Sequence, residues 1–238
     1  MTWSIVARDA ETGAFAVAVA TCNFAVGASC PFVRAGVGAV STQSITNRYL
    51  GPAILGALAR GVEPGAAIEG ALAGDAGADL RQVNVVDRLG RSAAWTGRHC
   101  VEWCGSESAP GVGVAGNMLA GRAVVRDTMD VMASAGGKLP ERLMAALWAG
   151  ERAGGDKRGR QSAAMVMVGL EDFPDLDLRV DDHPEPFAEL ERLLGIWRAT
   201  VAPAVGTRPR RGDVAGMIDL DVIEAGWVAR GLRIRFRH

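Results

Sequence analysis

Residues 3–21 read WSIVARDAETGAFAVAVAT, and this stretch decides the fold class. Two apolar runs, 3–8 and 14–21, are separated by a short polar segment in which Gly13 can adopt a positive φ. The pattern predicts a β-hairpin. Because the second run is apolar at every position except its last, it is typical of a strand that is covered on both faces. The hairpin is therefore expected inside a layered protein.

The rest of the chain alternates groups of strands with pairs of helices. Further strands are predicted at 36–44, as a pair within 82–97, at 111–119 and at 160–170. Helices are predicted at 51–60, 64–74, 121–135 and 139–151, and from about 185. Grouped strands and paired helices favour an α+β protein of antiparallel sheets over a doubly wound parallel sheet.

Two parts of the chain differ in character. Residues 1–198 carry the predicted strands and helices and are expected to form one domain. Residues 199–238 are richer in Arg and Pro and end in a short strand-like run, LRIRFRH. We expect a C-terminal extension that packs on the same domain or is partly mobile. Its arginines indicate a solvated tail or, alternatively, a docking or anion-binding surface.

Composition limits the partners. The 238 residues are 49% hydrophobic and 22% charged with a formal net charge of −1, so neither nucleic acid nor an anionic membrane is expected as a partner. Polar residues and glycines interrupt the apolar stretch 13–40, which argues against a spanning helix, and acidic and basic residues stand where a signal peptide would be apolar. We expect a cytoplasmic protein whose four cysteines are reduced thiols.

No metal or cofactor is expected. Cys100 and Cys104 lie beside His99, but the remaining cysteines do not form a matching pair. The segment GVGVAG at 111–116 matches GxGxxG without the βαβ context of a dinucleotide site. The adjacent Asp and His residues at 181–183 are read as a cap for the last helix, with cation binding as the alternative.

Thr2 is the candidate nucleophile. The chain has three histidines and no GxSxG, so a Ser-His-Asp triad has little support. A free α-amine, with an unperturbed pKa of about 7.7–8.0, can serve as the base instead. Removal of Met1 would give Thr2 both the hydroxyl and the amine. The alternatives are Ser4, two positions along the same strand face, and an ordinary strand-leading threonine.

Other polar residues stand where strands end. Arg8 and Asp9 close the first strand, as a hairpin ion pair or as substrate-orienting groups. Thr42 and Gln43 end a buried strand, where pocket residues often emerge. Asn117 ends the strand at 111–119 and is expected either to form a turn or to donate to an oxyanion.

A basic loop precedes the strand at 160–170. Its sequence GGDKRGRQS contains Arg158 and Arg160, both of which can bind a carboxylate in a bidentate manner. The alternative is a solvated loop between a helix and a strand. Together with Arg8, Asp9, Thr42 and Gln43, the two arginines complete the expected substrate-binding set.

Several long motifs carry a family resemblance. The segments MTWSIVARDAETG, AVAVAT, RAGVGAVSTQ, GNMLAG, GGDKRGRQSAA and LRVDDHPEP occur in the order seen in the DUF1028 family, and the chain resembles it over about residues 2–195. That family is grouped with the N-terminal-nucleophile hydrolases. The resemblance implies a four-layer αββα sandwich of two antiparallel sheets, but it implies no particular reaction or substrate.

The expected function is hydrolysis of a small, non-peptide amide by an N-terminal Thr nucleophile. The alternatives are a small-molecule-binding protein that keeps the fold without the chemistry and a dimeric scaffold. Apolar helix faces, such as those of 51–60 and 139–148, predict a homo-oligomer, in the simplest case a homodimer, unless these faces cover the sheets.

Overall fold

The computed structural model describes residues 2–236; Met1 and residues 237–238 lie outside the described part. The chain divides into two compact units, the first ending at Leu193 and the second beginning at Leu194. Each unit is described by itself.

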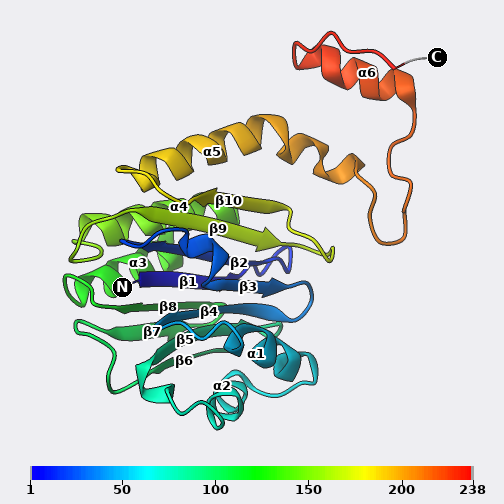
Figure 1. Cartoon of the computed structure of the whole chain (residues 1–238). Helices are drawn as coiled ribbons and strands as arrows, with labels where there is room; N and C mark the ends of the chain where they lie inside the picture. The colour runs from blue at the N-terminus through cyan, green and yellow to red at the C-terminus, as the bar shows by residue number, and fades with distance from the viewer. Residues whose placement is uncertain (1, 237–238) are drawn as a thin grey trace. The chain divides into compact units, whose positions relative to one another are not determined.

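Two antiparallel sheets form the centre of the first unit (Figure 1). The six-stranded sheet has the order β10-β9-β2-β1-β8-β7, and the four-stranded sheet has the order β3-β4-β5-β6. The strands of the larger sheet are β1 (Thr2–Arg8), β2 (Phe15–Thr21), β7 (Gly105–Ala109), β8 (Val112–Asn117), β9 (Ser162–Val168) and β10 (Leu176–Val180). Those of the smaller sheet are β3 (Pro31–Arg34), β4 (Gly38–Ser44), β5 (Arg81–Asp87) and β6 (Ser92–Thr96).

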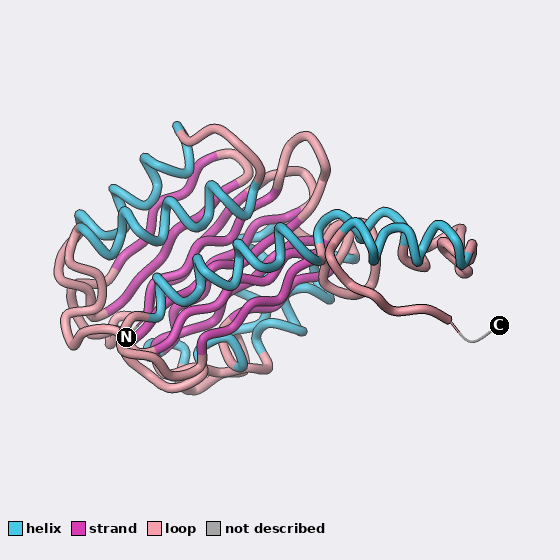
Figure 2. Tube along the Cα trace, turned by 90° about the horizontal axis from the view of Figure 1, so that it is seen from above, coloured by secondary structure: helices cyan, strands magenta, loops and turns pink. Residues whose placement is uncertain are grey.

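Helices cover the outer faces of both sheets, and Figure 2 shows helices on both sides of the aligned strands. Helices α1 (Leu50–Ala59) and α2 (Pro64–Leu72) pack on the four-stranded sheet. Helices α3 (Ala123–Ser134) and α4 (Leu139–Arg152) pack on the six-stranded sheet. The two sheets contact each other along their inner faces, where β1 lies against β4 and β5, and β8 lies against β5. The prediction of a four-layer αββα sandwich with antiparallel sheets is therefore confirmed.

Strand β1 is the central element because it lies between β2 and β8 in the larger sheet. Its side chains alternate between two layers. Trp3 points to the helical layer, where its ring stacks on that of Phe187 with centroids 5.7 Å apart. Val6 points the other way and packs with Ala39 and Val86 of the smaller sheet. Thr2 and Ser4 share the Val6 face, which looks into the layer between the sheets.

The apolar helix faces lie against the sheets. Ile54 and Leu58 of α1 are buried in a cluster with Val83 and Val85 of β5. Leu143 and Leu147 of α4 are likewise fully buried. These faces stabilise the layers within one chain, so they give no separate evidence for the expected homodimer.

Two helices follow the last strand in the sequence. Helix α5 (Pro186–Thr200) begins in the first unit and ends in the second, and α6 (Leu220–Ala229) belongs to the second. Asp219 caps α6 through its carboxylate, which accepts hydrogen bonds from Asp221 N and Val222 N. The expectation of a strand-like end at LRIRFRH is wrong for residues 232–236, which form no strand. There the backbone N–H of Phe236 donates to the Glu224 carboxylate rather than to a strand.

Candidate active site at the start of strand β1

Thr2 is the first residue of β1 and is 5% exposed. It pairs with Asn117 at the end of β8, on one side. On the other side, its hydroxyl donates to Thr21 Oγ1 at the end of β2, 3.3 Å away. Antiparallel pairing therefore brings one strand start and two strand ends together at Thr2.

Two side-chain amides hold the backbone carbonyl of Thr2. Gln43 Nε2 donates to this oxygen over 3.3 Å, and Asn117 Nδ2 donates to it over 3.4 Å. Gln82 Oε1 accepts a second hydrogen bond from each amide, at 2.8 Å from Gln43 and 2.9 Å from Asn117. Thr2 thus lies in front of a buried triad of amides drawn from both sheets.

The remaining atoms of the triad are also bonded. Gln82 Nε2 donates to Gly116 O at 2.8 Å and to Thr96 Oγ1 at 3.0 Å. Gln43 Nε2 also reaches the carbonyl oxygen of Ala115, at 3.1 Å. Because all three amides are at most 1% exposed, these bonds replace the water that the groups lose on burial. Such a network fixes the orientation of its members.

The layer between the sheets changes polarity along β1. At the Thr2 end it contains side-chain amides and hydroxyls, including Ser41 and Asn84, both of which are fully buried. At the Arg8 end it is an apolar cluster that includes Val6, Phe15 and Val86. Burial of polar groups costs free energy that an apolar filling would not. We therefore interpret the polar half of the layer as a candidate functional site and the apolar half as structural.

One loop crosses the start of β1. Ala120 N donates to Gly155 O, and Leu119 forms a backbone bridge with Asp156 beside the end of β8. The Asp156 carboxylate then accepts a hydrogen bond from Cys22 N, just after the end of β2, at 2.9 Å. Since β8 and β2 flank β1, residues 155–158 pass over the strand end that carries Thr2.

The two arginines of the segment GGDKRGRQS, Arg158 in the loop and Arg160 just after it, have different surroundings. Arg158 Nε and Nη2 both donate to Asp156, whose side chain is 1% exposed. Arg160 binds Glu151 and Glu185 and also the backbone carbonyl of Pro184. Arg160 therefore ties three segments together, whereas Arg158 is held at one edge of its guanidinium.

Arg8 and Asp9 lie at the far end of β1. Six residue steps of about 3.4 Å separate Arg8 from Thr2 along the strand, or about 20 Å. Asp9 Oδ1 accepts hydrogen bonds from Glu11 N, Thr12 N and Thr12 Oγ1 and so closes the hairpin turn. The structure does not bring these two residues to the Thr2 end, because a straight strand cannot return its C-terminal residue to its start.

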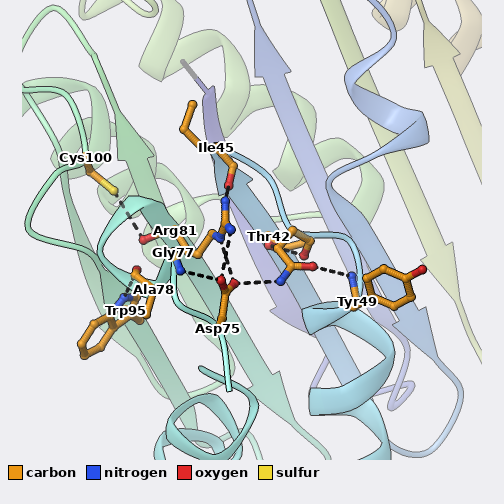
Figure 3. A network of polar contacts seen from close by, with 10 residues as sticks. Thr42, Ile45, Tyr49, Asp75, Gly77, Ala78, Arg81, Trp95 and Cys100 are labelled. Atoms are coloured by element: carbon orange, nitrogen blue, oxygen red, sulfur yellow. Dashed lines mark hydrogen bonds and ion pairs between the residues drawn. The ribbon is translucent and has the colours of Figure 1, made fainter. Parts of the chain in front are cut away.

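Thr42 and Gln43 point to opposite faces of β4. Gln43 faces Thr2, but Thr42 lies on the opposite, helix-covered face of β4, where its buried hydroxyl donates to the carbonyl oxygen of Asn47 (Figure 3). The two residues were expected to share a pocket, and only Gln43 reaches the layer between the sheets. Alternation of neighbouring side chains in a strand is the reason.

Beyond Thr42 lies a second polar cluster, centred on Asp75 (Figure 3). Arg81 donates to this carboxylate through two nitrogens, at 2.9 and 3.1 Å, and Asn47 Nδ2 donates at 2.8 Å. Arg81 Nη1 also donates to Ile45 O at 2.6 Å. The hydrogen bonds from Arg81, followed by those from Asn47, hold the pKa of the Asp75 carboxyl well below its usual range. The cluster thus fastens the chain after β4 to the chain before β5.

Ser4 does not offer an alternative nucleophile at the surface. Its side chain is fully buried between the sheets, and its hydroxyl has no hydrogen-bond partner among the described residues. In residues 2–236 no group of three or more His, Cys, Asp and Glu side chains is arranged to hold a metal ion. The four cysteines are free thiols.

Sequence reasoning missed Gln82, Thr21 and Asp156. Gln82 belongs to QVNVV, where Gln and Asn alternate with Val. This alternation usually marks a strand with one solvated face, but here the polar face lies against the second sheet. Thr21 and Asp156 carried a weaker signal, namely that each stands where a strand ends or a loop turns beside an apolar run.

These elements define an α+β sandwich with a buried polar site at the start of its central strand. The chain belongs to DUF1028, a family of unknown function whose model matches residues 2–190. A search of the curated proteins found none that matches. No described helix has the length and apolar character needed to cross a membrane.

A solved structure agrees with this assignment. A crystal structure of a DUF1028 protein from Silicibacter pomeroyi is 30% identical and superposes with a TM-score of 0.84 over 92% of this chain and 96% of that chain. Two Anbu proteins also match. The one from Hyphomicrobium sp. strain MC1, a Gly-1 mutant, is 14% identical with a TM-score of 0.41, and 82% of this chain and 94% of that chain are covered. The Anbu protein from Yersinia bercovieri, an ancestral β-subunit, is 10% identical with a TM-score of 0.39, and the coverage is 85% and 97%.

Proposed function

We propose that the protein hydrolyses a small amide, with Thr2 as N-terminal nucleophile after removal of Met1. The observation that carries this proposal is the position of Thr2, whose carbonyl is held by Gln43 and Asn117 while its hydroxyl lies beside Thr21. Buried amides that converge on the start of one strand hold the nucleophile in place, and a held nucleophile lowers the entropic part of a barrier.

The reaction has two steps. The Thr2 hydroxyl adds to the amide carbonyl and its proton passes to the α-amine, which returns a proton to the leaving amine as the C–N bond breaks. The product of this step is an ester of Thr2. Water, deprotonated by the same amine, then adds to the ester and releases the acid and the free hydroxyl.

Asn117 serves in this proposal as a positioning residue. An oxyanion role was expected for it, but its Nδ2 donates to Thr2 O and to Gln82 Oε1, and the side chain is 1% exposed. Both N–H bonds of this amide are therefore directed into the protein. In this proposal the groups that bind the substrate come from the loop over β1 rather than from Arg8 and Asp9.

The test uses a peptidyl epoxyketone. The Thr2 hydroxyl adds to the ketone and the Thr2 amine opens the epoxide, so the protein gains the whole probe mass only when both groups are free. We expect this gain for the wild type by intact-mass measurement and none for Thr2→Ala, in which the small second residue still permits loss of Met1. Ser4→Ala is the matched control and should label like the wild type. Retention of Met1 in the native host, or labelling of Thr2→Ala, would refute the proposal.

The second candidate is a small-molecule-binding protein without chemistry. It is favoured by the neutral character of the side chains at Thr2, since Gln43, Gln82 and Asn117 supply no charge. Binding of amides without turnover or labelling would establish it. The proposal also retains a cytoplasmic location, to which the four free thiols lend support, and a homodimer as the assembly to be tested by light scattering.

A further inference from the structure

We infer that Arg158 recognises a carboxylate on the substrate, so that the preferred amides are acidic ones, such as monoamides of dicarboxylic acids. This inference rests on the proposed function for its location, and it adds the class of substrate. It begins from the way in which the loop of residues 155–158 is fixed.

The loop is fastened at both sides of β1. Its carbonyl at Gly155 and its backbone at Asp156 bond to the chain that follows β8, and the Asp156 carboxylate bonds to Cys22 N. A Cβ on Gly155 would lie 3.3 Å from Trp3 Cη2, so the loop also packs on the ring that Trp3 projects from β1 into the helical layer. Arg158, two residues further on, is thereby placed at the end of β1 that carries Thr2.

Arg158 presents a free edge of its guanidinium. A guanidinium has five N–H donors and can bind a carboxylate through Nε and Nη2 or through its two Nη atoms. Asp156 occupies the first edge, with Nε at 3.4 Å and Nη2 at 3.2 Å from its oxygens. No other described residue accepts a hydrogen bond from this guanidinium, and the side chain is 38% exposed. The outer edge is therefore oriented and open.

The charge of the loop favours an anion. Asp156 offsets Arg158, but Lys157 donates to the backbone carbonyl of Glu102 at 2.6 Å and forms no ion pair with a described carboxylate. One positive charge therefore remains in the loop. The charge of Arg160 is met by Glu151 and Glu185, which removes that residue from competition for the ligand.

A buried carboxylate that orients an arginine is more than a surface ion pair. Asp156 accepts four hydrogen bonds, from Cys22 N, Arg158 N, Arg158 Nε and Arg158 Nη2. The arginine is consequently held before any ligand arrives, which reduces the entropy lost on binding. This arrangement suits a planar carboxylate bound by two parallel hydrogen bonds.

Binding is measured apart from catalysis. In a Thr2→Ala background, isothermal titration compares monoamides of malonic, succinic, glutaric and adipic acids with the corresponding neutral diamides. We expect at least one monoamide to bind about tenfold or more tightly than its diamide, as charge-assisted hydrogen bonds allow. Arg158→Gln should abolish that preference, and Arg158→Lys should keep part of it. Arg192→Gln, which removes an exposed arginine of α5, should leave it unchanged.

The outcomes separate the inference from the proposed function. If every monoamide binds no better than its diamide, or if the preference survives Arg158→Gln in a protein with a wild-type circular dichroism spectrum, the carboxylate site is refuted. If the monoamide preference depends on Arg158 but no epoxyketone labels the wild type, the carboxylate site stands and the hydrolase fails.

Discussion

Gln43 Nε2 lies 3.3 Å from the backbone carbonyl oxygen of Thr2, and the two residues belong to different sheets. Gln43 is the penultimate residue of β4 in the smaller sheet, and Thr2 begins β1 of the larger one. The hydrogen bond therefore joins the two sheets at the candidate site. Gln82, also from the smaller sheet, supports it by accepting a hydrogen bond from the same amide.

Replacing Gln82 by Leu should destabilise the protein by about 2–4 kcal/mol. The substitution removes the oxygen that accepts hydrogen bonds from both Gln43 and Asn117. Because both donors are buried, solvent water cannot replace this acceptor. Urea unfolding followed by circular dichroism measures the change. Gln161→Leu is the control, because its side chain makes one exposed hydrogen bond, to Asp182. Equal losses in the two variants would mean that the buried network contributes nothing special.

Ser4 and Ser162 should respond oppositely to alanine. Both are fully buried, but Ser4 Oγ has no described partner, whereas Ser162 Oγ donates to Asn23 O at 2.6 Å and accepts from Val26 N at 3.1 Å. We expect Ser4→Ala to leave the free energy of unfolding unchanged or raise it by up to about 1 kcal/mol, and Ser162→Ala to lower it by about 1–3 kcal/mol. Thermal or urea unfolding of the two variants measures these changes. A large decrease in the free energy of unfolding of Ser4→Ala would contradict the prediction for Ser4.

Asp75→Asn should destabilise the folded protein at neutral pH, and this effect should be smaller at acidic pH. The hydrogen bonds from Arg81, then Asn47, depress the pKa of Asp75 in the folded state, whereas the unfolded carboxyl titrates near about 3.9. The stabilisation is therefore present above that unfolded value and disappears as the pH falls through the folded pKa. We expect the free energy of unfolding to be about 1–3 kcal/mol lower in the variant than in the wild type at pH 7. This difference should become smaller below about pH 4.

The control for this pH dependence is Asp79→Asn. Asp79 pairs with Arg98, whose side chain is 81% exposed, so solvent screens the interaction. Its effect at pH 7 should be clearly smaller than that of Asp75→Asn. A difference between Asp75→Asn and the wild type that stays constant from pH 7 to pH 3 would show that the charge of Asp75 plays no part.

Cys30 should react with iodoacetamide at least about tenfold more slowly than Cys22 at pH 8. Burial raises the pKa of the Cys30 thiol to about 11, and the opposing hydrogen bonds from Ser29 and Thr46 do not offset it, so little thiolate is present. Cys22 is half-buried and can be reached by the reagent. Peptide mass spectrometry after timed alkylation gives both rates. Equal rates in the folded protein would contradict the burial of Cys30, and unfolding in urea should make the rates converge.

Two helical glycines should differ when replaced by alanine. A Cβ on Gly150 of α4 would lie 2.6 Å from Thr128 Oγ1 and 2.8 Å from Trp3 Nε1, whereas a Cβ on Gly56 of α1 would meet only Arg60 Nη1, at 3.6 Å. We expect Gly150→Ala to cost about 1–3 kcal/mol through overpacking. Gly56→Ala should raise the free energy of unfolding by up to about 1 kcal/mol, because alanine has the higher helix propensity. Calorimetric unfolding temperatures that move in the same direction would show that the contact of α4 with β1 is looser than described.

The layers could be predicted from the sequence, but three of the four edge strands could not. The hairpin of β1 and β2, and the strands that became β4, β5, β6, β8 and β9, were recognisable from their apolar patterns. The strands β3, β7 and β10 were not predicted, and all three are edge strands. Edge strands are short and face solvent, so sequences such as GSESA in β7 carry little apolar periodicity.

The candidate site was predictable only in part. The sequence singles out Thr2 because loss of Met1 would give it both a hydroxyl and an α-amine, and it singles out Gln43 and Asn117 because they stand near strand ends. The structure places these three together. Gln82 lies on the next strand of the sheet, and a sequence pattern does not show that two sheets will face each other with their polar sides inward. Arg8 is among the residues expected to orient the substrate, but it lies at the opposite end of β1 from Thr2.

The amide network has a consequence for the order in which reactivity can arise. Thr2 and Asn117 come from one sheet, and Gln43 and Gln82 come from the other, so neither sheet alone contains the arrangement that holds the Thr2 carbonyl. During folding, the Thr2 carbonyl is therefore held in place only once the sheets have docked. For the hydrolase proposed above, this means that nascent or partly folded chains would carry the Thr2 hydroxyl without its fixed setting and would not act on amides until the two sheets have docked.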